Sequence, residues 1–382
     1  MNLQYKPKRH LKFNMHGAFG YSTLNWFKVL FKNNFYIQVA EIPKVVWITL
    51  SILSTNVFRI YEDLRFNKAI SKVVIKEPVF ILGYPRSGTT YLHYLISKDN
   101  QFSFCATYQV LMPNLFLTMG VFLEKFLRGV LPKTRLMDNL KMTTTLPKEE
   151  EFALSAISDA SMVNGYYFPK NLTSYFNRYV LFKEDKSNEE EWKNKYLFFL
   201  RKVSLNQNGK RLLLKSPFNT GRIKQILEIF PDAKFIHIYR NPYEVYYSNE
   251  RLYEKLLPAF GFHKVQNDTI EKFIFSSYKL TYEKYFKELD IIARGNIASL
   301  TYEELIAAPI DSLKRVYSEI GLPNFEGASK QIQLEIDSYE NYKTNLHVMD
   351  QKVKELIDFE WGSTYKSIVN LSKKSNLTSE VV

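Results

Sequence analysis

The 382-residue chain contains only one cysteine, Cys105. A single cysteine excludes an internal disulfide, and no histidine or second cysteine stands at metal-ligand spacing from it. We therefore expect a buried structural thiol in a reducing compartment, rather than a nucleophile or a metal ligand.

Long apolar segments and flexible linkers are also scarce. The apolar passage at residues 45–58 is interrupted by Ser, Thr and Asn, and it falls short of the roughly 20 residues that span a bilayer. Residues 1–30 lack the ordered regions of a signal peptide. No Ser/Gly/Pro-rich stretch divides the chain. These absences predict a cytoplasmic protein without a transmembrane helix.

Positive charge, in contrast, is abundant and unevenly placed. The net charge is +13, and residues 1–76 hold twelve Lys and Arg against three acids, a balance of +9. Such asymmetry indicates a partner. Two interpretations stay open: the segment lies in the headgroup plane of the inner membrane surface, or it packs on the catalytic domain. No nucleic-acid-binding motif accompanies the charge, so nucleic acid is not an expected partner.

Apolar residues are plentiful. Hydrophobic residues make up 46% and aromatic residues 15% of the chain, which is enough for a large core and an apolar substrate pocket. We predict a helical N-terminal extension over residues 1–76 and one catalytic domain over residues 77–382.

The stretch at residues 78–100 is the strongest local signal. An apolar strand at residues 79–82 breaks at Gly83, passes through the turn GYPRSGTT, and is followed by helical spacing at Leu92, Leu95 and Ile96. A strand, a Gly-rich loop and a helix N-terminus present backbone N–H groups to an anion. This segment therefore predicts a phosphate or sulfate site.

The same loop departs from the nucleoside triphosphate pattern Gly-x4-Gly-Lys-Ser/Thr. Gly83 and Gly88 are correctly spaced and Thr90 fits the hydroxyl position, but Thr89 replaces the lysine. That lysine serves the β- and γ-phosphates, so the loop is predicted to bind a nucleotide whose transferred group is not a γ-phosphate. Arg86 supplies a positive charge instead.

Two further strand–turn–helix units follow. Lys215 ends a strand at residues 212–214, where ligands of open α/β sheets bind. Arg240 ends the next strand, and Asn241, Pro242 and Glu244 give a helix-start signature after it. Ser248 lies two turns into that helix, so Arg240 and Ser248 are predicted to hold a second phosphate.

An acidic segment begins after Pro147. Glu149, Glu150 and Glu151 precede an apolar run and are predicted to start a helix whose positive end they complement. A Glu triplet of this kind is most often a solvated face.

Together these segments resemble a bacterial branch of the sulfotransferases that use 3′-phosphoadenosine 5′-phosphosulfate (PAPS). The resemblance covers residues 78 to about 325 and rests on five motifs in order: PRSGTT, PKEEEFAL, KSPFNTGR, FPDAKFIHIYRNPYEVYYS and YEEL. It implies an α/β fold with a P-loop-kinase-like parallel sheet flanked by helices.

The resemblance also implies roles for particular residues. In the family the first loop holds the 5′-phosphosulfate, which implies that role for Arg86, Ser87, Gly88, Thr89 and Thr90. Arg240 and Ser248 match the pair that holds the 3′-phosphate. Lys215 matches the lysine at the sulfuryl group, where a flexible point charge is suitable. No metal is required.

The general base is assigned less directly. This branch often has a histidine in its Lys-Ser/Asn-Pro-x-His motif, but Asn219 stands there in this chain, and an amide does not accept protons. We therefore favour Glu149, with Glu151 second, as catalytic groups beside Lys215.

The acceptor is expected to be a hydrophobic, lipid- or sterol-like alcohol, because the region at residues 108–182 is rich in Tyr, Phe and Leu. Three alternatives stay open: a carbohydrate sulfotransferase, a nucleotide kinase or NTPase with a degenerate loop, and a non-catalytic membrane-bound protein.

Overall fold

The structure, a computed structural model, describes residues 16–135, 140–339 and 349–379. Residues 1–15 of the predicted extension lie outside the described part. The chain divides into two compact units: residues 1–75, 105–209 and 251–273 form one, and residues 76–104, 210–250 and 274–382 form the other. We call them the helical unit and the sheet unit. The division into an extension over 1–76 and a catalytic domain over 77–382 stays a prediction.

The sheet unit is built on five parallel strands in the order β2-β3-β1-β4-β5. Their bounds are β1 Val79–Leu82, β2 Phe102–Ser103, β3 Arg211–Lys215, β4 Lys234–Tyr239 and β5 Ile297–Thr301. Every residue of β1 is buried, as expected for a central strand covered on both faces. The predicted parallel sheet is confirmed, while the two-residue edge strand β2 is an addition.

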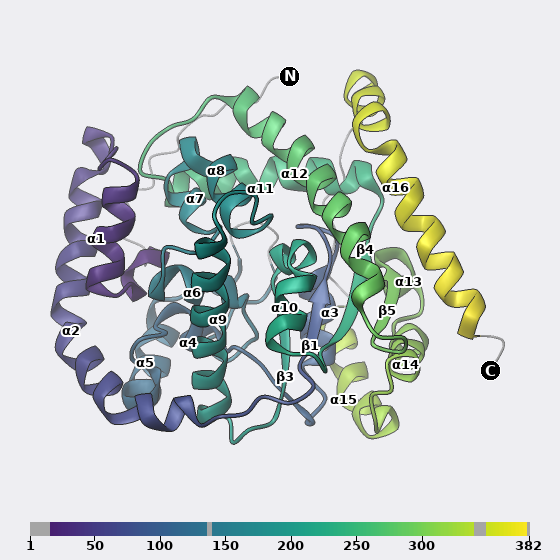
Figure 1. The fold of residues 1–382 in the computed structure, drawn as a ribbon, viewed down its shortest axis with the longest axis horizontal. Helices are drawn as coiled ribbons and strands as arrows, with labels where there is room; N and C mark the ends of the chain where they lie inside the picture. Colours follow the sequence, from purple (N-terminus) through teal and green to yellow (C-terminus); the bar gives the residue numbers. More distant parts are fainter. Residues whose placement is uncertain (1–15, 136–139, 340–348, 380–382) are drawn as a thin grey trace. The chain divides into compact units, whose positions relative to one another are not determined.

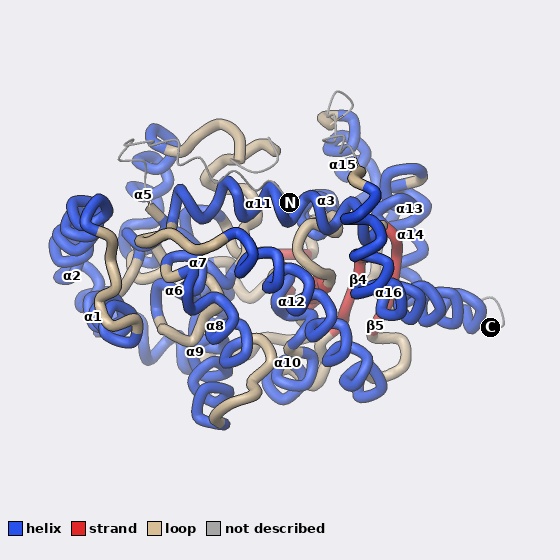
Figure 2. Tube along the Cα trace, turned by 90° about the horizontal axis from the view of Figure 1, so that it is seen from above, coloured by secondary structure: helices blue, strands red, loops and turns tan. Residues whose placement is uncertain are grey.

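Helices connect these strands (Figure 2). Those confined to the sheet unit are α3 Thr89–Ile96, α10 Ile223–Ile229, α13 Tyr302–Ala307, α14 Pro309–Glu319, α15 Phe325–Asp337 and α16 Gln351–Ser379. Two longer helices, α11 Pro242–Phe260 and α12 Asn267–Glu288, contain residues of both units. The predicted helices after the first, second and third strand–turn signals are α3, α10 and α11, so all three signals are confirmed.

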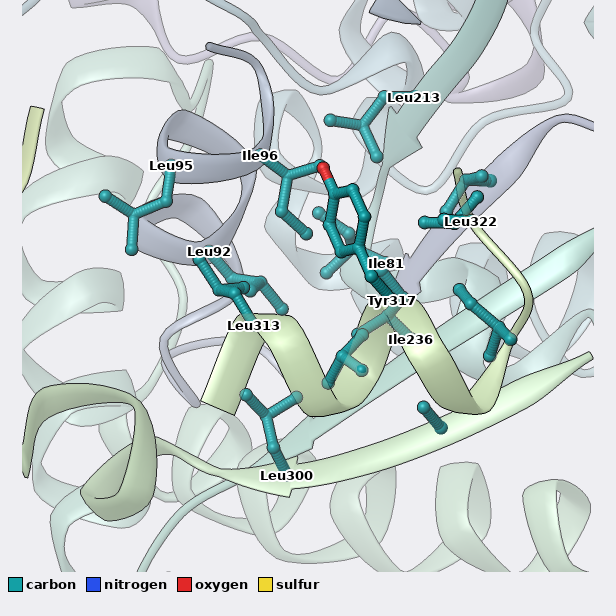
Figure 3. Packing of buried hydrophobic residues seen from close by; sticks show 14 of the residues in the cluster. Ile81, Leu92, Leu95, Ile96, Leu213, Ile236, Leu300, Leu313, Tyr317 and Leu322 are labelled. Atoms are coloured by element: carbon teal, nitrogen blue, oxygen red, sulfur yellow. The ribbon is translucent and has the colours of Figure 1, made fainter. Parts of the chain in front are cut away.

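One apolar core fills the space between the sheet and α3, α14 and α15 (Figure 3). Ile81 and Ile236 contribute from the strands, and Leu92, Leu313 and Tyr317 contribute from the helices. This core holds the carboxyl ends of β1, β3 and β4 in place. Gly83 follows β1, Lys215 ends β3, and Arg240 follows β4.

The helical unit contains η1 Gly17–Gly20, α1 Thr23–Lys32, α2 Ile42–Ser71, α4 Thr107–Leu111, α5 Phe116–Val130, α6 Glu150–Ile157, α7 Asn164–Tyr167, α8 Leu172–Tyr179 and α9 Lys186–Asn206. Helices α4 and α5 are separated around Pro113, because a proline inside a helix removes a backbone donor and clashes with the preceding turn. Cys105 is buried, as predicted, and burial raises its thiol pKa.

Helices α1 and α2 lie side by side (Figure 1). Trp26 Nε1 donates a hydrogen bond to Thr49 Oγ1 at 2.9 Å between them. Farther along α2, the buried Glu62 carboxylate pairs with Lys202 Nζ of α9 at 2.6 Å and accepts from Thr118 of α5. Because both partners of the ion pair are buried, these contacts anchor α2 along one side. Within the described residues, no helix is long and apolar enough to cross a membrane.

Candidate active site

The Gly-rich loop has the backbone shape that an anion site needs. Gly83, Arg86 and Gly88 have positive φ angles of 149°, 74° and 97°. Gly83 N–H donates to Thr220 Oγ1 at 2.7 Å, and Ser87 Oγ donates to Tyr84 O at 2.7 Å, which hold the turn in place. Helix α3 begins at Thr89 directly after Gly88. The positive end of α3 therefore faces the loop.

Gly88 is also constrained by packing. A methyl group at this position would overlap the aromatic ring of Tyr302, the first residue of α13. The same ring lies under the guanidinium of Arg240, 4.5 Å from its carbon Cζ. Burial raises the pKa of Tyr302, while the charges of Arg240 and Arg86 lower it. Tyr302 thus lies between the loop and Arg240.

The second predicted site is joined directly to the first. Arg86 Nε of the loop donates to Ser248 Oγ of α11 at 2.9 Å. One residue on, Asn249 Nδ2 donates to Pro85 O at 2.9 Å. Arg240 pairs with Glu244 one helical turn later, at 3.2 Å. Asn241 caps α11 by accepting the N–H of Tyr243, as its sequence signature predicted.

Lys215 lies at the adjacent strand end. Its side chain is buried, and Nζ lies 3.3 Å from Thr90 Oγ1, while the residue pairs in register with Ile81 of β1. His93 on α3 is buried nearby: desolvation, with a contribution from the Lys215 charge, lowers its pKa to about 3. His93 is therefore neutral, and the positive charge in this place belongs to Lys215.

The turn that follows β3 is a 3-10 helix, η4 Pro217–Gly221. Asn219 stands where the similar sulfotransferases often have a histidine, and it is buried. Its Oδ1 lies 3.3 Å from Nη1 of the buried Arg222. The sequence predicted neither the contact with Arg222 nor the role of Thr220 in holding Gly83. Thr220 and Arg222 both belong to the KSPFNTGR motif, so this motif is the sequence signal that could have identified them.

The acidic segment belongs to the helical unit. Glu149 is the N-cap of α6 and is half-buried, whereas Glu150 and Glu151 are fully buried. Tyr196 OH donates to Glu150 Oε1 at 2.7 Å, and Glu151 Oε1 accepts from Ser161 Oγ and Met162 N–H, both at 2.9 Å. The expectation of a solvated Glu face is wrong for two of the three residues, because hydroxyl and amide donors within the unit satisfy their carboxylates.

Within the described ranges, no cluster of three or more His, Cys, Asp or Glu side chains is arranged to hold a metal ion.

Comparison with known proteins gives consistent results. A model of the sulfotransferase family matches residues 78–327. The chain is 29% identical over 339 residues to the omega-hydroxy-beta-dihydromenaquinone-9 sulfotransferase Stf3 of Mycobacterium bovis and of Mycobacterium tuberculosis, covering 88% of this chain and 87% of the relative.

Solved structures agree in fold. Sulfotransferase STF9 of Mycobacterium avium superposes with a TM-score of 0.64 at 17% identity, covering 80% of this chain and 81% of that one. STF1 of Mycobacterium tuberculosis superposes with a TM-score of 0.60 at 16% identity, covering 84% and 89%.

Proposed function

The chain belongs to the sulfotransferase family, and from this premise we propose that it transfers the sulfuryl group of PAPS to a hydroxyl of a lipid-like acceptor. It is an enzyme of a class that normally uses PAPS. Beyond the family and the enzyme class, the proposal names PAPS as the donor, the residues that act on it, and the class of acceptor.

The hydrogen bond between Arg86 and Ser248 carries the donor proposal. It joins the loop proposed for the 5′-phosphosulfate to the helix proposed for the 3′-phosphate, at 2.9 Å. A nucleotide with phosphates on both sides of one ribose needs two cationic sites close together, and an ATP site needs no second one. Arg86, Ser87, Gly88, Thr89 and Thr90 would hold the first group, and Arg240 and Ser248 the second.

Lys215 is proposed to stabilise the negative charge that develops on the sulfuryl and bridging oxygens during in-line transfer. Its ammonium is buried beside Thr90, the last residue of the proposed 5′ site. A buried cation acts on developing charge more strongly than an exposed one, because water does not screen it.

Glu149 is proposed as the general base. Glu151 was the second candidate, but its carboxylate accepts hydrogen bonds from Ser161 and Met162, which favours a structural role. Glu149 stands at the N-cap position of α6 and is only half-buried, so its carboxylate is better suited to meet an acceptor hydroxyl. Asn219 would orient a substrate oxygen, since an amide donates and accepts hydrogen bonds without taking a proton.

The acceptor proposal is a hydrophobic alcohol. It is supported by the name of the relative Stf3, which acts on a menaquinone derivative, and by the aromatic character of the helical unit. A lipid-like acceptor is dissolved in a membrane, so peripheral contact with an anionic inner surface belongs to the same proposal.

A transfer assay tests the function. The purified protein is incubated with PAPS and a panel of long-chain, isoprenoid and sterol alcohols and sugars, with EDTA present, and sulfated products are found by mass spectrometry. We expect sulfation of a lipid-like alcohol without added Mg²⁺. Sulfation of sugars alone would contradict the lipid-like acceptor and favour a carbohydrate sulfotransferase.

Nucleotide choice tests the donor separately. We expect adenosine 3′,5′-bisphosphate (PAP) to raise the melting temperature more than ADP does. Mg²⁺-dependent ATP turnover that is insensitive to PAP would contradict the proposal and favour an NTPase.

A further inference from the structure

Helix α2 is apolar on two sides. One side packs inside the helical unit through Val45, Ile48 and Ile52. The opposite side forms a second apolar stripe that is exposed to solvent: Val46, Leu50, Leu53, Val57, Ile60 and Leu64. These residues recur three or four positions apart, so they share one helix face over about 27 Å. A surface helix ordinarily presents polar residues on this side.

The neighbouring helices also carry exposed apolar side chains. On α1, Leu24 and Phe31 are exposed while Trp26 and Val29 are buried. On α5, Phe122 and Phe126 lie four residues apart on one helix face. The two phenyl rings are exposed and stack 6.2 Å apart. We refer to the exposed apolar side chains of α1 and α2 as the outer face.

The charges beside the outer face have one sign. Arg65, Lys68 and Lys72 are exposed along the end of α2 and just beyond it. The acids of residues 16–76 are only three, and none offers a free exposed carboxylate: Glu41 pairs with Lys44, Glu62 is buried, and Asp63 is half-buried. Exposed apolar area next to unbalanced cations matches the chemistry of an anionic bilayer surface.

We propose that the outer face binds an anionic lipid bilayer, with the stripe of α2 in the interfacial layer and the cations at the headgroups. A second copy of the chain is the less favoured occupant. In a twofold interface the same patch meets itself, and this patch holds cations without acids to pair them.

The outer face is connected to the candidate base within the same unit. The inner side of α1 contacts α6, since Asn25 Nδ2 donates to Ser155 O at 2.8 Å and Ser22 N–H donates to Ala156 O at 2.9 Å. Helix α6 begins at the Glu149 segment. Resting on the proposed function, this contact gives the outer face a role: it brings the helix of the proposed base to the membrane that contains the acceptor.

Vesicle co-sedimentation of the full chain tests the inference. Vesicles of phosphatidylcholine alone are compared with vesicles that also contain phosphatidylglycerol. We expect binding to the anionic vesicles that weakens with added salt. Leu50→Glu should reduce that binding about tenfold, because it places a charge where a leucine is buried in the interface. Lys68→Glu combined with Lys72→Glu should remove the preference for the anionic lipid.

A matched control is available in the sheet unit. Leu334 on α15 has the same exposed fraction as Leu50, 56%, and Leu334→Glu should leave vesicle binding unchanged. Both leucines are exposed, so neither substitution should lower the melting temperature appreciably. Equal binding of Leu50→Glu and the parent chain would overturn the inference. So would sedimentation velocity showing a dimer that Leu50→Glu dissociates, which would assign the face to a second copy.

The readouts separate this inference from the proposed function. PAP-induced stabilisation and sulfation of a water-soluble short-chain alcohol should be the same for Leu50→Glu and the parent chain. Loss of vesicle binding with intact PAP binding supports a membrane face on a sulfotransferase. A parent chain that binds anionic vesicles but not PAP would contradict the proposed donor and leave the membrane face standing.

Discussion

Single residues decide how the proposed donor is held and how its charge is neutralised. Two cations of the candidate site each contact a hydroxyl: Arg86 contacts Ser248, and Lys215 contacts Thr90. Pairing of this kind positions a long, flexible side chain before the ligand binds, so less conformational entropy is lost on binding. Arg240 is held differently, between Glu244 and the ring of Tyr302.

Lys215→Met is expected to lower kcat about a hundredfold, because a cation aimed at developing charge is removed while the buried stem volume is kept. PAP affinity should change less, since the phosphates are assigned to Arg86, Arg240 and the loop. Steady-state kinetics and calorimetric PAP titration measure the two effects. Equal loss in kcat and in PAP affinity would show that Lys215 acts mainly in binding.

Glu149→Gln and Glu151→Gln should fail in different ways. Glu149→Gln is expected to remove activity without changing the melting temperature, because Gln keeps the shape but not the proton acceptor. Glu151→Gln replaces a buried carboxylate that accepts two hydrogen bonds with an amide. It should lower the free energy of unfolding by about 1–3 kcal/mol. Thermal unfolding and the transfer assay together separate these outcomes; full activity in Glu149→Gln would remove it as the base.

At the scale of elements, the strand–turn–helix units were predictable because turn residues and apolar periodicity are local properties. The capping of α11 by Asn241 followed from the same rules. Burial of Glu150 and Glu151 was not predictable, since it depends on Tyr196 and Ser161, which are distant in sequence or lie in another element. Helix α2, with thirty residues, is also longer than the apolar passage at residues 45–58. It continues past that passage because Lys202 and Thr118 stabilise the buried Glu62.

The turn between β1 and α3 gives an element-scale prediction. Gly88→Ala should lower stability by about 2 kcal/mol and weaken PAP binding, because a methyl group at φ +97° would meet the Tyr302 ring. Gly129→Ala on α5 is the matched control, since its added methyl meets nothing within 4 Å. Denaturant unfolding and PAP titration of both variants provide the test; equal behaviour of the two would show that the loop tolerates a Cβ.

For the whole molecule, buried neutral histidines lower stability in acid. Burial lowers the pKa of His237 from 6.5 to about 3, and of His16 likewise to about 3. Above pH 6.5 these rings are neutral in both states and contribute nothing to the pH dependence. Below pH 6.5 the unfolded chain takes up protons that the folded chain does not, so the free energy of unfolding falls as the pH decreases.

His237→Phe should reduce this acid sensitivity. Each such histidine adds a slope of about 1.4 kcal/mol per pH unit between pH 6.5 and pH 3. Phenylalanine keeps a ring against Tyr285, whose centroid lies 4.6 Å from that of His237. Urea unfolding at pH 7 and pH 5 should show a smaller difference for the variant than for the parent chain. An unchanged difference would mean that the pKa of His237 is the same in the folded and unfolded states.

The central claim is that two adjacent cationic sites in the sheet unit hold one nucleotide by its 3′ and 5′ phosphates. Calorimetric titration of PAP and of 5′-AMP into the parent chain, Arg240→Ala and the exposed control Arg294→Ala tests it most directly. We expect the parent chain and Arg294→Ala to bind PAP at least about tenfold more tightly than 5′-AMP, and Arg240→Ala to bind both alike. A preference for PAP that persists in Arg240→Ala would contradict the account.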